Sequence, residues 1–339
     1  MKFSQFLRED ALELALPTDV RSAIIDKGGK IYQVGGAVRD DMLGKVSKDL
    51  DLLVVGIELK DLATLLARFG KTNLVGKAFG IIKFVPEGAT EEIDISVPRI
   101  DSKSTGKGHK DFEVKLGKGI TLTQDQLRRD FWMNAMARDV ETGEIHDIDN
   151  KGRTDIENQE IRVIGSRAFR EDPLRMLRAV QFAARFDFKI ESETMKQIKR
   201  NVNLIKTVSP ERFQEEFKKM FEKGTPSIGV DLLKETGILK KLFPKAKGIF
   251  PVEYDKLDKK AFPAFLAVLL RGQKSKDIQS AMRLSSEDTN AVSDVLKYMA
   301  MRDVDSDVGL VRVHENSHTK RYTERELCTQ GTKKNRLGL

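Results

Sequence analysis

The chain has 339 residues, of which 40% are hydrophobic and 33% charged, and it carries a net charge of +8. This length predicts two or three domains with the composition of a soluble globular protein. The sequence has no run of about 18 apolar residues and no apolar signal segment at its start, which excludes a membrane span and secretion. The single cysteine, Cys328, excludes an internal disulfide and favours the reducing cytoplasm. The positive charge favours an anionic partner such as nucleic acid, although solvated basic faces are common, and nothing indicates a protein partner.

The first hundred residues predict a small sheet with helices between its strands. Apolar residues recur at helical spacing in some segments and alternate in others, which separates helices from strands. In chain order we expect a lead-in helix and a helix ending at Gly28-Gly29 within residues 1–30, a strand at 31–34, a short helix at 37–43 closed by Gly44, a strand at 50–55, a helix at 60–69, and an antiparallel pair of strands at 80–85 and 92–97.

The stretch from 32 to 55 carries the first candidate site. Asp49 and Asp51 lie two apart on a predicted strand, so both carboxylates point to the same side and repel each other unless a cation lies between them. Carboxylate oxygens beside a phosphate suit Mg²⁺. Gly35 and Gly36 lack a Cβ, so the backbone there can approach a phosphate at the start of the following helix. Asp94 becomes a third carboxylate if its strand lies beside that of Asp51. This layout predicts phosphoryl or nucleotidyl transfer.

Residues 101–127 are rich in Gly, Lys, Ser and Thr and have few large apolar residues. This composition predicts a mobile loop near an active site, with a surface linker as an equal alternative. Residues 127–139 predict a helix whose inner face carries Phe131, Ala135 and Met136. Its other face would gather Arg128, Arg129, Asp130 and Asn134. Two adjacent arginines can hold a triphosphate by forked hydrogen bonds, although an Arg pair at a solvated helix end is the commoner case.

The second half of the chain predicts helices, and residues 166–186 form its key segment. Asp172 is expected at the N-cap and Pro173 at the first helical position. The polar residues of this otherwise apolar helix form one stripe, namely Glu171, Arg175, Arg178, Gln181 and Arg185. Such a stripe predicts the lining of a cleft between domains, and the alternative is that Asp172 only caps the helix while the arginines pair with nearby carboxylates.

The remaining segments predict a helical body and a polar end. Further helices are expected within 191–222, with Ser209 as a cap ahead of Pro210, and at 226–243, 261–270 and 286–301, with a linker near 244–260. The composition turns polar and basic after residue 301, which predicts a poorly ordered tail.

Five motifs follow in an order that resembles a known family. They are GGAVRD at 35–40, DLD at 49–51, RRDFWMNA at 128–135, EDPLRMLRA at 171–179 and SPERFQEE at 209–216. Between about residues 31 and 245 the chain is similar to the class II tRNA nucleotidyltransferases, which comprise the bacterial-type CCA-adding enzymes and the bacterial poly(A) polymerases. The resemblance implies an α+β fold with a polymerase-β-like head and a small mixed sheet, followed by all-helical regions. We expect the head at 1–153, a neck at 154–222, a body at 223–300 and the tail at 301–339.

The resemblance also implies roles for individual residues. The implied metal-binding pair is Asp49 and Asp51, with Asp94 as a third acidic residue; the implied nucleotide-binding residues are Gly35, Gly36, Arg39, Arg129, Asp130, Asn134, Asp172, Arg175 and Arg178. The segment 101–127 matches a flexible loop implicated in switching from C to A addition. One departure is Gln181, where family members often carry Arg.

The motif that would read the base can be examined physically. A carboxylate only accepts hydrogen bonds and a guanidinium only donates. Asp172 can therefore accept from the exocyclic amine of cytosine or adenine, while Arg175 donates to the adjacent ring nitrogen or carbonyl. Uracil and guanine present a carbonyl in place of that amine, and each buried polar group left unpaired costs about 1–3 kcal/mol. The protein itself could thus select C and A without a template.

These observations predict a Mg²⁺-dependent enzyme that adds CCA to the 3′ end of tRNA from CTP and ATP. The alternatives are a poly(A) polymerase, a CC-adding or A-adding enzyme, and an inactive RNA-binding protein on the same fold. A dinucleotide-binding oxidoreductase is disfavoured because the glycine turn lacks the G-x-G-x-x-G pattern.

Overall fold

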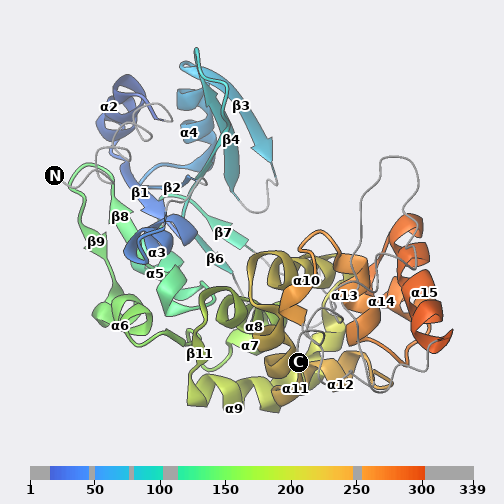
Figure 1. The fold of residues 1–339 in the computed structure, drawn as a ribbon. Helices are drawn as coiled ribbons and strands as arrows, with labels where there is room; N and C mark the ends of the chain where they lie inside the picture. The colour runs from blue at the N-terminus through green and yellow to red at the C-terminus, as the bar shows by residue number, and fades with distance from the viewer. Residues whose placement is uncertain (1–15, 46–49, 76–79, 102–113, 247–253, 302–339) are drawn as a thin grey trace, which may run out of the picture. The chain divides into compact units, whose positions relative to one another are not determined.

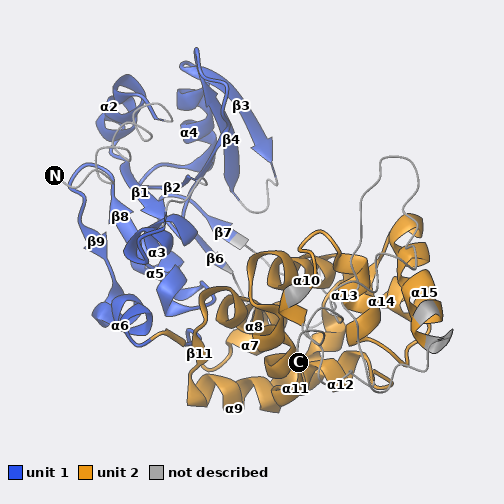
Figure 2. Cartoon of the chain, viewed as in Figure 1, with its two compact units in different colours: residues 1–158, 162–165 blue, residues 159–161, 166–339 orange. Residues whose placement is uncertain are grey.

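The computed structural model describes residues 16–45, 50–75, 80–101, 114–246 and 254–301. The chain divides into two compact units, the first formed by residues 1–158 with 162–165 and the second by residues 159–161 with 166–339 (Figure 2). Unit 1 contains the large sheet, and the described residues of unit 2 are mostly helical (Figure 1). Among the residues that the structure describes, no helix is both long and apolar enough to cross a membrane.

A seven-stranded mixed sheet forms the centre of unit 1, with the order β3-β4-β5-β2-β1-β8-β9. Its strands are β1 (Lys30–Val34), β2 (Asp51–Val55), β3 (Gly70–Val75), β4 (Ile81–Pro86), β5 (Ile93–Ser96), β8 (Ala137–Asp139) and β9 (Ile145–His146). Only β2 and β5 pair in parallel, and all other neighbours are antiparallel. The predicted fold class, an α+β head with a small mixed sheet followed by helices, is confirmed.

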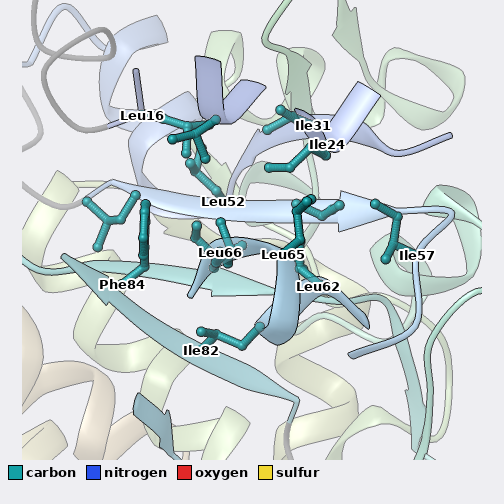
Figure 3. Packing of buried hydrophobic residues seen from close by; sticks show 14 of the residues in the cluster. Leu16, Ile24, Ile31, Leu52, Ile57, Leu62, Leu65, Leu66, Ile82 and Phe84 are labelled. Atoms are coloured by element: carbon teal, nitrogen blue, oxygen red, sulfur yellow. The ribbon is translucent and has the colours of Figure 1, made fainter. Parts of the chain in front are cut away.

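One face of this sheet is covered by helices α2 (Thr18–Asp26) and α4 (Leu59–Leu66). Leu52, on the central strand β2, packs against Leu62 and Leu66 of α4 and against Ile24 of α2 in one cluster of buried side chains (Figure 3). Full burial of each such side chain stabilises the fold by about 1.5–3 kcal/mol. Because side chains alternate along a strand, this packing turns Asp51 and Leu53 to the opposite face.

The segment from 114 to 139 differs from the prediction in two ways. Residues 114–116 form strand β7, which pairs with β6 (Arg99–Asp101), and Thr121 with Gln124 makes a capping box that opens helix α5 (Leu122–Leu127). The expectation of a loop was therefore wrong for 114–116 and 122–127, while 102–113 lies outside the described residues. The predicted helix over 127–139 was also wrong, because α5 ends at Leu127 and the chain continues through the extended residue Phe131 into a 3-10 turn, η1 (Trp132–Asn134), and strand β8.

The break after α5 has a local cause. The Asp130 carboxylate accepts the backbone N–H of Phe131 at 2.8 Å and the Asn134 amide at 3.0 Å. A short acidic side chain that bonds the backbone in this way competes with helical hydrogen bonds. The predicted inward residues Phe131, Ala135 and Met136 are all buried, so burial was predicted correctly while the period was not.

Unit 2 is a stack of short helices around α8. Its principal helices are α7 (Ala168–Glu171), α8 (Leu174–Phe186), α9 (Ser192–Asn201), α10 (Pro210–Lys223), α11 (Pro226–Glu235), α12 (Ile238–Leu242), α13 (Phe262–Leu269), α14 (Ser275–Met282) and α15 (Ser286–Met301). Helix α8 packs against α10 and α11, which explains why ten of its residues are buried. The helices expected at 261–270 and 286–301 are confirmed, and α14 was missed. Ser209 precedes α10 as predicted but makes no side-chain capping bond.

The division of the chain expected from the sequence, including the head at 1–153, stays a prediction. The helical neck, body and tail, with boundaries after residues 222 and 300, also stay a prediction. The residues expected to form the tail beyond 301 lie outside the described part of the chain.

Candidate active site

The candidate site of unit 1 is built around the glycine turn between β1 and helix α3 (Gly36–Met42). Gly35 has φ +72°, a value that side chains with a Cβ rarely adopt. A Cβ on Gly35 would lie 3.3 Å from Nη1 of Arg129 and 3.8 Å from Oδ2 of Asp51. The bare backbone of this turn therefore lies between a guanidinium and a carboxylate that come from distant parts of the sequence.

Arg39 connects this turn to the motif around residue 130. Its side chain is buried, Nε and Nη2 donate to Asp40 at 2.8 and 2.6 Å, and Nη1 donates to Oδ1 of Asn134 at 2.5 Å. Asn134 in turn donates to Asp130. A Cβ added to Gly36 would lie 3.2 Å from Nη2 of Arg39. Four predicted nucleotide-binding residues therefore lie together, namely Gly36, Arg39, Asp130 and Asn134. The network fixes the turn against the segment that carries Arg129.

Two predicted carboxylates lie near the starts of two neighbouring inner strands of the sheet. Asp51 of β2 and Asp94 of β5 are register partners in the parallel pair, so their side chains leave the same face. Lys83, the partner of Asp94 on β4, contacts Glu92 at 2.6 Å and Asp94 at 3.3 Å. The hydrogen bonds to Glu92 and Asp94 raise the pKa of Lys83 above its usual value. Lys83 therefore stays cationic beside the acidic residues.

The donor set fits a hard cation. Asp51 and Asp94 supply carboxylate oxygens, the ligands that Mg²⁺ and similar ions prefer. Within the described residues no group of three or more potential metal ligands is found. That search does not reach Asp49, the other half of the predicted pair, which lies outside the described part of the chain.

Sequence reasoning missed Asp125, which holds both predicted arginines. Its carboxylate is fully buried, and it pairs with Arg128 at 2.7 Å and with Arg129 at 3.1 Å. The signal was available, since an acidic residue three and four positions ahead of two arginines shares a helical face with them. It was overlooked because it falls at the end of the polar stretch assigned to a loop.

The predicted base-reading residues belong to unit 2. Asp172 accepts the backbone N–H of Leu174 at 3.1 Å and also pairs with Arg212 of α10 through two bonds of 2.8 and 3.3 Å. Arg175 lies 3.9 Å from Glu171. Helix α8 begins at Leu174 with Pro173 at its N-cap, so Asp172, which was predicted at the cap, lies one residue before it, although its carboxylate bonds the Leu174 N–H. The predicted cleft between domains stays a prediction.

Arg178 and Gln181 lie further along the same helix. Arg178 pairs with the buried Glu216 at 3.4 Å, and its guanidinium stacks 5.0 Å from the centre of the Phe182 ring. Gln181 is 2% exposed, and within the described residues its Nε2 atom meets no hydrogen-bond acceptor. The contact with phosphate or base that an Arg at this position was expected to make stays a prediction.

Comparison with known proteins gives a consistent assignment. A family model described as the poly A polymerase head domain matches residues 31–162, and a model described as the probable RNA and SrmB-binding site of polymerase A matches residues 187–249. The chain is 40% identical over 225 residues to a multifunctional CCA protein of Nitrosomonas europaea, covering 66% of this chain and 52% of that protein. It is 35% identical over 227 residues to a CCA-adding enzyme of Pseudomonas entomophila, covering 65% and 57% of the two chains.

Solved structures show the same likeness. The fold resembles the Bacillus stearothermophilus CCA-adding enzyme in complex with CTP, with a TM-score of 0.69, 28% identity, and coverage of 86% of this chain and 70% of that one. The Thermotoga maritima CCA-adding enzyme complexed with tRNA aligns with a TM-score of 0.64 and 25% identity, covering 85% and 73%.

The fold is that of a polymerase-β-like head followed by helices. Over residues 31–162 and 187–249 the chain is similar to the family of class II tRNA nucleotidyltransferases and bacterial poly(A) polymerases, as the resemblance of its motifs indicated. Similarity to this family implies a divalent metal cofactor. The chain spans about half the length of the curated relatives it matches.

Proposed function

We propose that this chain catalyses template-independent addition of CCA to the 3′ end of tRNA, using CTP and ATP and releasing pyrophosphate. The observation that carries the proposal is the convergence on the Gly35 turn of the Asp51 carboxylate and the Arg129 guanidinium. A nucleoside triphosphate needs both a cationic group for its phosphates and a carboxylate for the metal that accompanies it. The relatives named as CCA-adding enzymes, one of them solved with CTP and another with tRNA, support this choice of substrates.

The head residues would bind and orient the triphosphate. Arg129 would donate to phosphate oxygens from one side of the turn, and the backbone of Gly35 and Gly36 would approach them without steric hindrance. Arg39 is 4% exposed and donates to Asp40 and Asn134, so it would keep the turn in place. Its direct contact with phosphate, implied by the resemblance, stays a prediction.

Mg²⁺ is the cofactor that we propose, and Asp49, Asp51 and Asp94 are the residues that would hold it. When bound, such an ion lowers the pKa of an attacking hydroxyl and neutralises charge on the phosphates. Lys83 contacts Asp94, so it would share the task of neutralising these carboxylates. In unit 2, Asp172 and Arg175 would read the exocyclic amine and the adjacent acceptor of cytosine and adenine. The cytoplasmic location expected from the sequence remains part of the proposal.

The test is extension of a tRNA transcript that ends at its discriminator base. Each nucleoside triphosphate is supplied singly and then CTP is combined with ATP, with Mg²⁺ present and products resolved to one nucleotide. Growth by C, C and A followed by a stop is the expected result. A long tail with ATP alone would assign poly(A) polymerase activity, and binding of RNA without extension would assign an inactive binding protein.

Two matched variants connect the result to the site. We expect Asp51→Asn to abolish extension, because it removes a carboxylate at the proposed metal site while keeping its size. The control is Asp61→Asn, a change of the same kind at an exposed position on α4. Equal activity of the two variants would contradict the proposed role of Asp51.

A further inference from the structure

Asp125 is a fully buried carboxylate to which neither the comparisons nor the motifs assign a role. It lies in the last turn of α5, and its side chain is 0% exposed. A buried charge is unfavourable unless it is paired and hydrogen-bonded. The charge of Asp125 is balanced by two consecutive arginines, Arg128 and Arg129, and its carboxylate also accepts one backbone N–H.

The two carboxylate oxygens of Asp125 are divided between their partners. Oδ1 accepts from Nε of Arg128 at 2.8 Å and from the backbone N–H of Arg99 at 3.2 Å. Oδ2 accepts from Nε and Nη2 of Arg129 at 3.3 and 3.1 Å. One edge of the Arg129 guanidinium is therefore turned toward Asp125. The remaining nitrogen, Nη1, lies toward the Gly35 turn, 3.3 Å from the place of an added Cβ.

The charges of this group favour anion binding. Burial alone raises the pKa of Asp125. The guanidiniums of Arg129 and Arg128 and the hydrogen bonds together lower it by more, so the pKa lies below its usual value. Asp125 is thus ionised at neutral pH. With two arginines around one carboxylate the group keeps one net positive charge, and a planar guanidinium held along one edge loses little further freedom when its other nitrogen binds a ligand.

We propose that Asp125 is a positioning residue that holds the Arg129 guanidinium along its Nε–Nη2 edge, so that Nη1 points at the glycine turn and meets the triphosphate of the incoming nucleotide. The proposal rests on the proposed function for the identity of the ligand. It extends that function by naming a residue that need not touch the nucleotide and by stating which nitrogen of Arg129 does.

The competing explanation is that Asp125 only stabilises the fold. In that case its carboxylate anchors α5 to the backbone of Arg99 and to Arg128, and its contact with Arg129 has no consequence for ligands. The two explanations differ in a double-mutant cycle, because positioning acts through Arg129 whereas an anchor acts without it.

The experiment measures equilibrium binding of inorganic triphosphate, CTP and cytidine to the 339-residue chain and to Asp125→Asn, Arg129→Ala and the double variant. We expect Asp125→Asn to weaken triphosphate and CTP about tenfold, which corresponds to about 1.4 kcal/mol, and to leave cytidine unchanged. In the Arg129→Ala background the same change should have almost no further effect. In tRNA extension, the KM for CTP should rise in Asp125→Asn while kcat changes less.

The matched control is Asp147→Asn, which alters another carboxylate of unit 1 that accepts two backbone N–H groups, those of Gly152 and Arg153. It should leave triphosphate binding unchanged. If Asp125→Asn does not fold, as judged by urea unfolding, Asp125→Glu takes its place. Because the longer side chain shifts the carboxylate away from Arg129, its triphosphate affinity should fall about threefold.

The outcomes separate this proposal from the proposed function. An equal loss of triphosphate affinity in the presence and absence of Arg129, or no loss in a folded variant at position 125, overturns the positioning role. If the unaltered chain does not extend tRNA, the proposed function fails, but a coupled loss of triphosphate binding would still support the positioning of Arg129. If the unaltered chain extends tRNA but the effects of the changes at Asp125 and Arg129 are independent, the proposed function stands and the positioning role of Asp125 is refuted.

Discussion

Replacement of Asn134 by Ala should destabilise unit 1 because Asn134 joins two charged groups in the interior. Its amide accepts from Nη1 of Arg39 and donates to Oδ1 of Asp130, and the three side chains are between 4% and 9% exposed. A hydrogen bond to a charged group contributes about 1.5–3 kcal/mol, so the loss of two such bonds costs about 3 kcal/mol at the lower end of the range. Arg39 keeps its bonds to Asp40, which prevents a larger loss.

Urea unfolding followed by fluorescence measures this loss where it occurs. The only tryptophan of the chain, Trp132, lies two residues before Asn134, and its ring contacts Lys151 at 4.5 Å from the ring centre. Its emission therefore reports the unfolding of unit 1. The control is Asn73→Ala, which changes an exposed side chain of the edge strand β3 and should alter the free energy of unfolding by less than about 0.5 kcal/mol. Equal midpoints for the two variants would refute the reasoning.

Four further outcomes are expected. Leu62→Ala, at a fully buried position under the sheet, should cost about 2–5 kcal/mol in urea unfolding, whereas Ile25→Ala, which is 40% exposed, should cost far less. Burial raises the pKa of Tyr254 to about 12, so its neutral form stabilises the fold below the unfolded pKa of about 10 and this stability is lost as the pH rises from 10 toward 12. Tyr254→Phe should remove that part of the pH dependence, measured as the difference in urea midpoints between about pH 9 and about pH 11.5. Asp172→Asn keeps an acceptor for the Leu174 N–H but adds a donor, so misincorporation of UTP should rise in the extension assay, and an unchanged product would favour the cap-only alternative. The affinity for tRNA should fall with salt as phosphate contacts are lost, and a constant Kd between about 50 and 200 mM salt would contradict binding through the backbone.

Part of the sheet was predictable: the strands β1, β2, β4 and β5 were expected, and β4 and β5 alternate buried and half-buried side chains. Strand β3 was missed, and β8 lies in the segment predicted as a helix. The antiparallel pair β4 and β5 and the short helix after the glycine turn follow from the local pattern. The parallel pairing that places Asp94 opposite Asp51 could be stated only as a condition, since a strand's neighbour depends on the path of the whole chain. Local sequence patterns indicate which residues of a strand face inward, but they do not indicate which strand lies beside it.

The misses have different physical causes. Between 127 and 139 buried residues lie so close together that helical and extended spacing fit equally well, and the backbone bond of Asp130 decides the outcome. Asp125 was overlooked because its stretch has the composition of a loop, although the capping box of Thr121 and Gln124 marks a helix there. Arg212 and Glu216 pair with residues about 40 positions earlier, a separation that no local period can reveal.

The pairing of Asp172 with Arg212 leaves this carboxylate able to cap a helix and still to read a base. An ionised carboxylate offers about four lone-pair sites, and the bonds from Leu174 and Arg212 use three of them. Capping, ion pairing and acceptance from an exocyclic amine are therefore compatible on one side chain. Arg212 and the helix start also fix the orientation of the carboxylate, and a fixed acceptor discriminates against a facing carbonyl more strongly than one that can rotate away. The local bonds that a cap-only explanation would cite are thus also the condition under which Asp172 could select a base.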